Sequence, residues 1–335
     1  MSTSKDRMAL PLAAALAAGA ALAMTATVQA DVIYTADATF TQPEDLGDVR
    51  VRVENNTTVT LDAPAGSWTN FTGDQQVQTR GGVNVITIRA DQPDYGSLWL
   101  AYRADGADGT LNIEDAAVSF ASDFQNTSAF IAAGWSGANG TTGTLNISGP
   151  SASFSASADV RVGYAFHSSY GPVSGTIKQS GGTVSIGGDL LMNAASQTAG
   201  STGLYHVDGS GMSISVAGVL MTDSSSTLKF TLDDGGITAI GVGENQDALS
   251  GTIDLSWDGG ATPTPGTYDL IVRSGGDGLI DISGLSLAAG QDALWSLDNS
   301  AEGVVQATFV PEPASLTLVG MSLTLLVSRR RGSRR

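Results

Sequence analysis

The pentapeptide Gly-Thr-Leu-Asn-Ile occurs twice in this chain, at residues 109–113 and again at residues 143–147. Two further segments, beginning at Gly175 and Gly203, follow the same template when positions are counted from the first glycine. Most residues at two, four, nine and eleven positions after each glycine are apolar or aromatic, and the residue at ten positions is always serine. Because side chains alternate between the faces of a strand, each segment predicts short strands that bury one face.

These segments start 34, 32 and 28 residues apart, and a unit of this size cannot bury its apolar face alone. Stacking of the units predicts an all-β fold, a right-handed parallel β-helix (β-solenoid) with capping strands. A β-sandwich with glycine-rich turns is the alternative. With the length variation placed after the eleventh position, one buried column is expected: Phe120, Phe154, Ile186 and Ile214. The serines form an outward, solvated ladder: Ser119, Ser153, Ser185 and Ser213.

Strand-like runs also flank the repeats, which we assign to residues 101–240. Residues 31–100 contain an alternating run at 49–54 and are interpreted as an N-terminal β cap or as degenerate coils of the solenoid. Residues 241–309 contain further β-rich runs and are interpreted as a C-terminal β cap.

The charge of the chain is strongly negative, and its ends conceal part of it. The formal net charge is −17, while residues 1–30 carry +1 and residues 313–335 carry +5, so the segment between them carries −23. Such a charge repels nucleic acids and anionic membrane surfaces, and a nucleic-acid partner is not expected. The absence of cysteine excludes disulfides, thiolate metal sites and a cysteine nucleophile.

The N-terminus has the features of a secretory signal peptide. Lys5 and Arg7 precede an alanine- and leucine-rich apolar run over residues 8–26. Small or modest residues then lead to Ala30, so cleavage is expected between Ala30 and Asp31. Residues 1–30 are therefore assigned as a signal helix that is removed on Sec-type export.

The C-terminus combines a proline-rich tripeptide, a short apolar run and a basic cluster. The apolar run, residues 314–328, would form a helix about 22 Å long, shorter than a hydrocarbon core of about 30 Å. It suits a transient hold in the inner membrane, with the basic cluster on the cytoplasmic side. The flanking residues are Pro311, Glu312 and Pro313 before the run, and Arg329, Arg330 and Arg331 after it.

This tripartite arrangement over residues 310–335 resembles the PEP-CTERM sorting signal, which exosortase-type machinery recognises. The resemblance implies transient membrane anchoring, processing near Pro311–Pro313, and delivery to the cell surface or extracellular matrix. The proline, glutamate and arginine residues named above would then be recognised residues and not catalytic ones. The repeats resemble, more loosely, the glycine-rich β-helix passengers of such proteins. An ordinary tail anchor with an incidental Pro-Glu-Pro is the alternative.

Acidic loops provide the only candidate metal ligands. Residues 275–283 are similar to a calcium-binding nonapeptide, but the motif occurs once and its second aspartate stands one position late. Hard oxygen ligands in such loops suit Ca²⁺. Solvated turns in an acidic protein are the simpler interpretation. The weak candidates are Asp233, Asp234, Asp277 and Asp281. No other cofactor is expected.

Residues for catalysis are few, and no catalytic residue is assigned. The two histidines, His167 and His206, stand at different repeat positions, which does not favour a triad or a zinc site. A lyase-type site would draw on Arg89, Arg103 and Arg161. Tryptophans would stack on sugars if they were exposed, but no two of them are close together in the sequence, so packing in the core or the caps is the simpler interpretation. They are Trp68, Trp99, Trp135, Trp257 and Trp295.

We therefore expect a non-enzymatic structural or adhesive protein of the cell surface or extracellular matrix, with extracellular polysaccharide as a candidate partner. A secreted polysaccharide lyase or hydrolase on the same fold is the alternative.

Overall fold

The computed structural model describes residues 30–41, 44–45, 49–62, 68–69, 76–102, 105–121, 126–134, 140–194, 198–243, 246, 248–262 and 264–310. This described part is all-β. It contains no helix that is long and apolar enough to cross a membrane. Of the predicted signal helix, residues 1–30, all but Ala30 lies outside the described residues, and Ala30 is the first residue of a strand. The predicted tail helix also lies outside them.

Three long sheets and one small one make up the described part of the molecule. Sheet A contains β1 (Ala30–Tyr34), β4 (Val49–Glu54), β7 (Gln76–Arg80), β10 (Ser97–Leu100), β13 (Thr127–Gly134), β16 (Asp159–Ala165), β19 (Leu190–Met192) and β22 (Leu220–Thr222). Sheet B contains β2 (Ala38–Phe40), β5 (Thr58–Leu61), β8 (Val83–Ile88), β11 (Asp108–Glu114), β14 (Thr141–Ser148), β17 (Val173–Gln179), β20 (Thr202–Asp208), β23 (Ser226–Leu232), β25 (Ser250–Trp257) and β27 (Gly284–Leu287). Sheet D contains β9 (Gln92–Tyr95), β12 (Ala117–Phe120), β15 (Ser153–Ala156), β18 (Thr183–Ile186), β21 (Ser213–Val216), β24 (Ile240–Val242), β26 (Gly266–Arg273), β29 (Val304–Phe309) and β28 (Trp295–Asp298). A small sheet C pairs β3 (Glu44–Asp45) with β6 (Trp68–Thr69).

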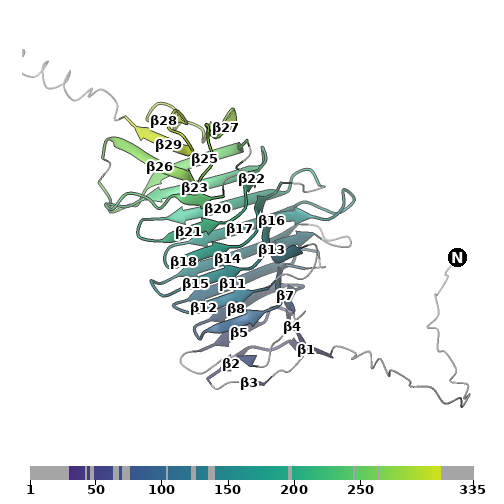
Figure 1. Cartoon of the computed structure of the whole chain (residues 1–335). Coiled ribbons are helices and arrows are strands. Elements are labelled where there is room, and N and C mark those ends of the chain that lie inside the picture. Colours follow the sequence, from purple (N-terminus) through teal and green to yellow (C-terminus); the bar gives the residue numbers. More distant parts are fainter. Residues whose placement is uncertain are drawn as a thin grey trace, which may run out of the picture.

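From β7 to β24 the chain visits sheets A, B and D in turn, so that strands three apart in the chain are neighbours in the same sheet (Figure 1). Among the described strands, sheet C takes the place of sheet D before β7, and the strands after β24 join sheets B and D. The neighbours from β1 to β24 pair in parallel, for example β11 with β14 and β14 with β17. Among the described strands, antiparallel pairing is confined to β26, β28 and β29. The fold is thus all-β with long parallel sheets, which is compatible with a β-solenoid and not with the antiparallel pairing of a β-sandwich.

The repeat template places its first strands in sheet B as predicted. Gly109, Gly143, Gly175 and Gly203 are aligned in register across β11, β14, β17 and β20. Two positions later, one inward column is formed by Leu111, Leu145, Ile177 and Tyr205, all of them buried. Close backbone contacts explain the glycines, because a Cβ on Gly143 would lie 2.2 Å from the amide nitrogen of Ala132.

The predicted column in sheet D is wrong in its register, although all four of its residues are buried. The structure has two adjacent columns instead. One contains Val118, Phe154, Val184 and Ile214, and the other contains Phe120, Ala156, Ile186 and Val216.

The turn from sheet B to sheet D explains this difference, because its length alternates. Four residues separate Ile113 from Val118, whereas six separate Ile147 from Phe154. Two extra residues keep each side chain on the inner face and shift the register by two positions. The length variation therefore does not lie only after the eleventh template position.

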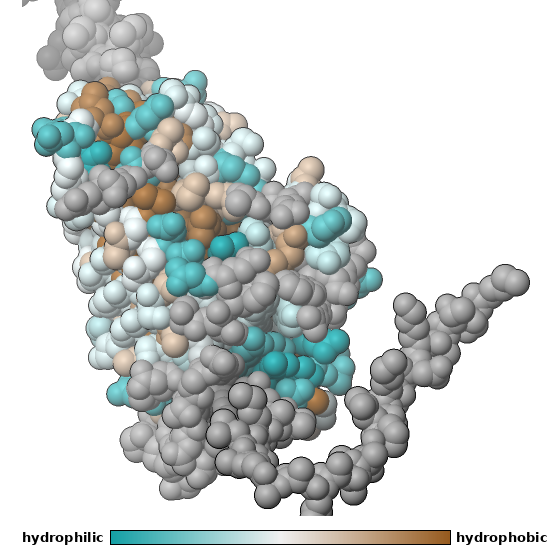
Figure 2. Space-filling view, turned by 45° about the vertical axis from the view of Figure 1, so that its right-hand side comes forward, coloured by the Kyte–Doolittle hydropathy of each residue, from teal (hydrophilic) through white to brown (hydrophobic). Residues whose placement is uncertain are grey.

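One apolar core runs through the stack, from Val51 to Phe309. Residues 31–100 contribute strands to the same three sheets as the repeats. At the far end β26, β28 and β29 turn antiparallel, and the rings of Trp295 and Phe309 lie 4.9 Å apart over the last core layer. On the face seen in Figure 2, apolar side chains gather toward this end and hydrophilic ones toward the N-terminal end.

The bend after the sheet A strands repeats one backbone conformation. Ala101 and Asn193 directly follow β10 and β19, and Ala132 and Gly163 lie two residues before the ends of β13 and β16. All four have positive φ, between 49° and 70°. This left-handed conformation turns the chain sharply toward sheet B. Three different residue types occupy the bend, so the template did not reveal it.

Candidate functional site

The outer face of sheet D presents rows of small hydroxyl side chains, which we call the hydroxyl face. Seven of its eight residues carry a hydroxyl group and the eighth is alanine: Ala117, Ser153, Thr183 and Ser213 form one row, and Ser119, Ser155, Ser185 and Ser215 form the other. All eight are exposed or half-buried. The predicted serine ladder is thus two rows rather than one, for the same reason that the inner column is split.

The local sequence explains the orientation of these side chains. In β15, Phe154 and Ala156 are buried, so the intervening Ser153 and Ser155 must face outward. Equivalent residues of neighbouring strands lie about 4.8 Å apart, and residues two apart along a strand lie about 6.6 Å apart. The hydroxyl face is therefore a flat, regular array of neutral hydrogen-bond donors and acceptors.

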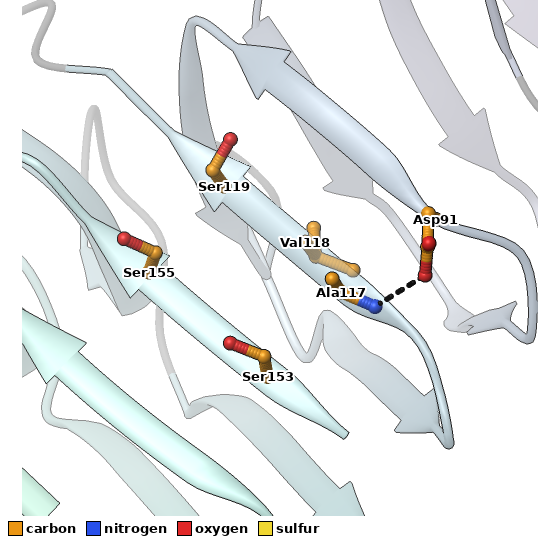
Figure 3. A pocket seen from close by; sticks show the side chains of 6 residues that line it. All are labelled: Asp91, Ala117, Val118, Ser119, Ser153 and Ser155. Atoms are coloured by element: carbon orange, nitrogen blue, oxygen red, sulfur yellow. Dashed lines mark hydrogen bonds between the residues drawn. The ribbon is translucent and has the colours of Figure 1, made fainter. Parts of the chain in front are cut away.

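A shallow hollow of about 290 Å³ lies at one corner of the hydroxyl face. It is lined by Asp91, Ala117, Val118, Ser119, Ser153 and Ser155 (Figure 3). The one carboxylate in the lining belongs to Asp91, and its Oδ1 accepts a hydrogen bond of 2.9 Å from the backbone amide of Ala117. A nucleophilic serine needs a base within hydrogen-bond reach, and no histidine lines this hollow.

The outer face of sheet B carries both lysines of the exported segment. Lys178, His206 and Lys229 are direct neighbours on β17, β20 and β23. Lys178 Nζ lies 3.1 Å from a carboxylate oxygen of Asp208, and Lys229 Nζ lies 3.6 Å from one of Asp254. These ion pairs neutralise the row.

His206 does not form a catalytic relay in this row. Its Nε2 contacts Thr231 Oγ1 at 2.8 Å, and the same nitrogen lies 3.8 Å from Asp208. A triad requires a hydroxyl and a carboxylate on different ring nitrogens. Burial lowers the pKa of His206, the two flanking lysines lower it further, and Asp208 and Asp254 oppose them. His167 lies after β16, where its Nδ1 contacts Ser169 Oγ at 2.7 Å.

Three of the four calcium candidates accept backbone hydrogen bonds. Asp233 accepts hydrogen bonds from Ser210 and Gly235, and these bonds lower its pKa against the effect of partial burial. Asp234 accepts one from the amide of Thr262. Asp281 accepts one from the amide of Ser283, which lowers its pKa. Within the described residues no three acids or histidines gather around a point that could hold a metal ion, and Asp277 belongs to no such group.

The arginine candidates have structural partners. Arg89 lies 2.7 Å from Glu114 and 3.6 Å from Asp62 on the outer face of sheet B. The Arg161 guanidinium lies 4.7 Å from the ring centroid of Tyr164, a cation–π contact. Arg103 lies outside the described residues.

Three tryptophans have described side chains, and none is an open platform for a sugar. Trp99 is 3% exposed and packs against Phe130, with ring centroids 4.2 Å apart. Trp295 is 5% exposed and Trp257 packs beside it in the C-terminal cap. The side chains of Trp68 and Trp135 are outside the described part.

The expected cleavage site lies at the start of the fold. Ala30 and Asp31 are the first two residues of β1, and Asp31 forms ion pairs with Arg52 at 3.0 Å and Arg50 at 3.8 Å. The sorting residues Pro311, Glu312, Pro313, Arg329, Arg330 and Arg331 lie outside the described residues.

Comparison with known proteins gave no match to a family model, to a curated protein or to a solved structure.

Proposed function

We propose that this chain is a non-enzymatic, exported structural or adhesive protein whose hydroxyl face binds extracellular polysaccharide. In this proposal sheets A, B and D wind as a right-handed parallel β-helix, in keeping with the usual hand of parallel crossover connections. The single observation that supports it best is the hydroxyl face itself, eight aligned positions without a charge in an acidic protein.

A neutral array of this kind suits a hydroxylated polymer. Each hydrogen bond exchanged with water contributes little, on the order of 1 kcal/mol. Affinity would come from repetition, because a polymer lying along the stack meets equivalent donors and acceptors on β12, β15, β18 and β21. The protein would act as a spacer or cross-linking element of a matrix.

The two chain ends support export to that location. The signal peptide would direct Sec-type export, and the PEP-CTERM-like tail would hold the chain in the inner membrane until exosortase-type processing near Pro311–Pro313 delivers it to the surface or matrix. In this proposal Ala30 and Asp31 flank the signal cleavage site, and Glu312 with its two prolines is read by the sorting machinery.

A polysaccharide lyase or hydrolase on the same fold is the alternative. It would need a pair of available carboxylates, or an arginine beside a base. On the outer face of sheet B, however, Glu114, Asp208 and Asp254 are held in ion pairs with Arg89, Lys178 and Lys229. These contacts favour a structural role.

The test is glycan-array binding of residues 31–310, with a depolymerisation screen on every glycan bound. The double variant Ser155→Lys/Ser185→Lys places two long charged side chains on the hydroxyl face and should weaken binding at least tenfold. Thr144→Lys/Thr176→Lys is the matched control, because this pair is aligned in the same way on the outer face of sheet B. Equal losses in both variants, or release of shortened glycan, would contradict the proposal.

A further inference from the structure

The two ends of the stacked sheets differ in how they close the core. At the C-terminal end the chain turns back on itself, and the antiparallel β26, β29 and β28 cover the last layer (Figure 1). At the N-terminal end no comparable reversal is present among the described strands, and β1, β2 and β3 are the first strands of their sheets.

The first core layer is correspondingly open. The inward side chains of β1 and β2 are only half-buried: Val32, Tyr34, Ala38 and Phe40. Their neighbours one layer further in have no exposed surface: Val51, Val53, Val59 and Leu61. An apolar layer is therefore left partly in water at this end, together with Ile33, whose exposed fraction is 45%.

The strand edges at this end are also incomplete. Among the described strands, β1 has a partner, β4, on one side only, and β2 likewise has only β5. A sheet edge of this kind presents backbone N–H and C=O groups that pair readily with another strand. A polypeptide that binds at this end must therefore cover the half-buried apolar side chains of β1 and β2 and provide a strand that pairs with the open sheet edge.

The position of the chain start limits where that occupant can come from. On the proposed cleavage after Ala30, the exported chain begins at Asp31, the second residue of β1. No upstream segment then remains to fold over the first layer. The C-terminal end of a second copy is a poorer match, because β26, β28 and β29 already pair antiparallel there and leave Trp295 and Phe309 no more than 8% exposed. Only Leu285 and Leu287 of β27 are half-buried core side chains in the last strand of sheet B.

We propose that the exported form pairs end to end with a second copy of itself, through the open layer and the edge of β1. A two-fold axis across the strands sets β1 antiparallel to β1 of the other copy, so that one self-complementary surface covers both apolar layers. This inference rests on the signal cleavage in the proposed function. The dimer would be one stack of strands with twice the length of the monomer, and each copy would contribute its own hydroxyl face.

Charge makes a specific prediction for this dimer. The segment between the two chain ends carries −23, so two copies repel one another over most of their surface. Added salt screens this repulsion, because the Debye length falls from about 10 Å at 0.1 M to about 3 Å at 1 M ionic strength. Dimerisation through an apolar layer should therefore strengthen as NaCl is raised, whereas a contact held by ion pairs would weaken.

The first test is sedimentation equilibrium of residues 31–310, a fragment that contains the apolar core and all the described strands except for Ala30. We expect a dimer whose dissociation constant falls with salt. Ile33→Lys, which adds a charge at the edge without touching the core, should raise that constant at least tenfold. Leu279→Lys is the matched control, since Leu279 is an apolar side chain with an exposed fraction of 56%, and it should dimerise like the parent.

The second test uses the absence of cysteine in the chain. A short bis-maleimide should cross-link Ile33→Cys into a dimer and leave Leu279→Cys monomeric. A monomeric parent at every salt concentration, a ladder of larger species, or equal cross-linking of both variants would overturn the proposal. So would a monomer in which the β1 amides resist hydrogen exchange, because the end would then be covered by its own chain.

The mass of the exported protein separates the two proposals. If the exported chain is cut after Ala30 but remains monomeric, the dimer proposal is contradicted and the proposed function is not. An exported chain that retains residues 1–30 would contradict both the signal cleavage and the dimer of the exported form.

Discussion

Phe120 lies opposite Ala156 in the neighbouring strand, yet its ring contacts Phe154, with centroids 5.8 Å apart and an interplanar angle of 42°. The contact is diagonal because the two phenylalanines occupy adjacent columns of sheet D. Phe120 thus has the small Ala156 beside it on one side and the ring of Tyr95 on the other, with centroids 5.5 Å apart and an interplanar angle of 47°. The rings in this part of the core are tilted and do not meet face to face.

Truncation of Phe154 tests this packing. Phe154→Ala should lower the free energy of unfolding by about 3–5 kcal/mol, because the residue is completely buried and its column offers only Val118 and Val184 to fill the space. Ser155→Ala, one residue further on the outer face, should change it by less than about 0.5 kcal/mol. Urea denaturation of both variants measures the difference. A loss below about 1 kcal/mol for Phe154→Ala would mean that sheet D does not enclose a rigid core.

The bend after sheet A can be tested at Gly163. Its φ is +70°, and a Cβ there would lie 2.0 Å from the carbonyl oxygen of Thr202. Gly163→Ala should lower the melting temperature clearly, since the left-handed conformation alone costs about 1–2 kcal/mol and the clash adds to it. Ala132→Gly at the equivalent bend, with φ +64°, should have a much smaller effect because it relieves that strain. Similar losses in the two variants would argue against a shared bend geometry.

Stability should depend on pH through His206. Its pKa is lowered in the folded protein, chiefly by burial and then by the flanking lysines. As pH falls below the ordinary histidine value of 6.5, the unfolded chain takes up the proton first, so the folded state loses stability until its own lower pKa is passed. His206→Gln should remove this part of the pH dependence. The free energy of unfolding, measured by denaturation at each pH, should fall more in the parent than in the variant between about pH 7.5 and 5.5. An equal fall in both would contradict this prediction.

Calcium should act by screening alone. The described carboxylates of Asp233, Asp234 and Asp281 accept backbone hydrogen bonds, and no three ligands converge in the described residues. We expect NaCl, at matched ionic strength, to raise the melting temperature as much as millimolar CaCl₂, and EDTA to have no effect. A rise with calcium that sodium does not reproduce would reveal a specific site.

The tail can be tested by substitution and peptide mapping. Changing Pro311, Glu312 and Pro313 to alanine should leave export intact, because the N-terminal signal is unchanged, and should trap the protein in the inner membrane. In the parent, surface-extracted protein should end near Pro311–Pro313. Recovery of a peptide containing Leu323 to Arg329 from that fraction would identify an ordinary anchor.

The sequence by itself determined the repeat, the parallel alignment of its glycines and the inward or outward direction of most side chains. This was possible because strand periodicity and close backbone contact act locally, as at Gly109 and Gly143 in neighbouring strands. The alternation of Phe154 with Ser153 and Ser155 likewise predicts the faces of β15 without knowledge of its neighbours.

Only the tertiary structure decided which residues lie side by side across the strands of sheet D. A turn that is longer by two residues leaves every side chain on its face, so the sequence pattern looks the same for either register. Backbone pairing between strands some thirty residues apart then selects Val118, and not Phe120, as the neighbour of Phe154. The same long-range pairing turned one expected row of serines into the two rows of the hydroxyl face.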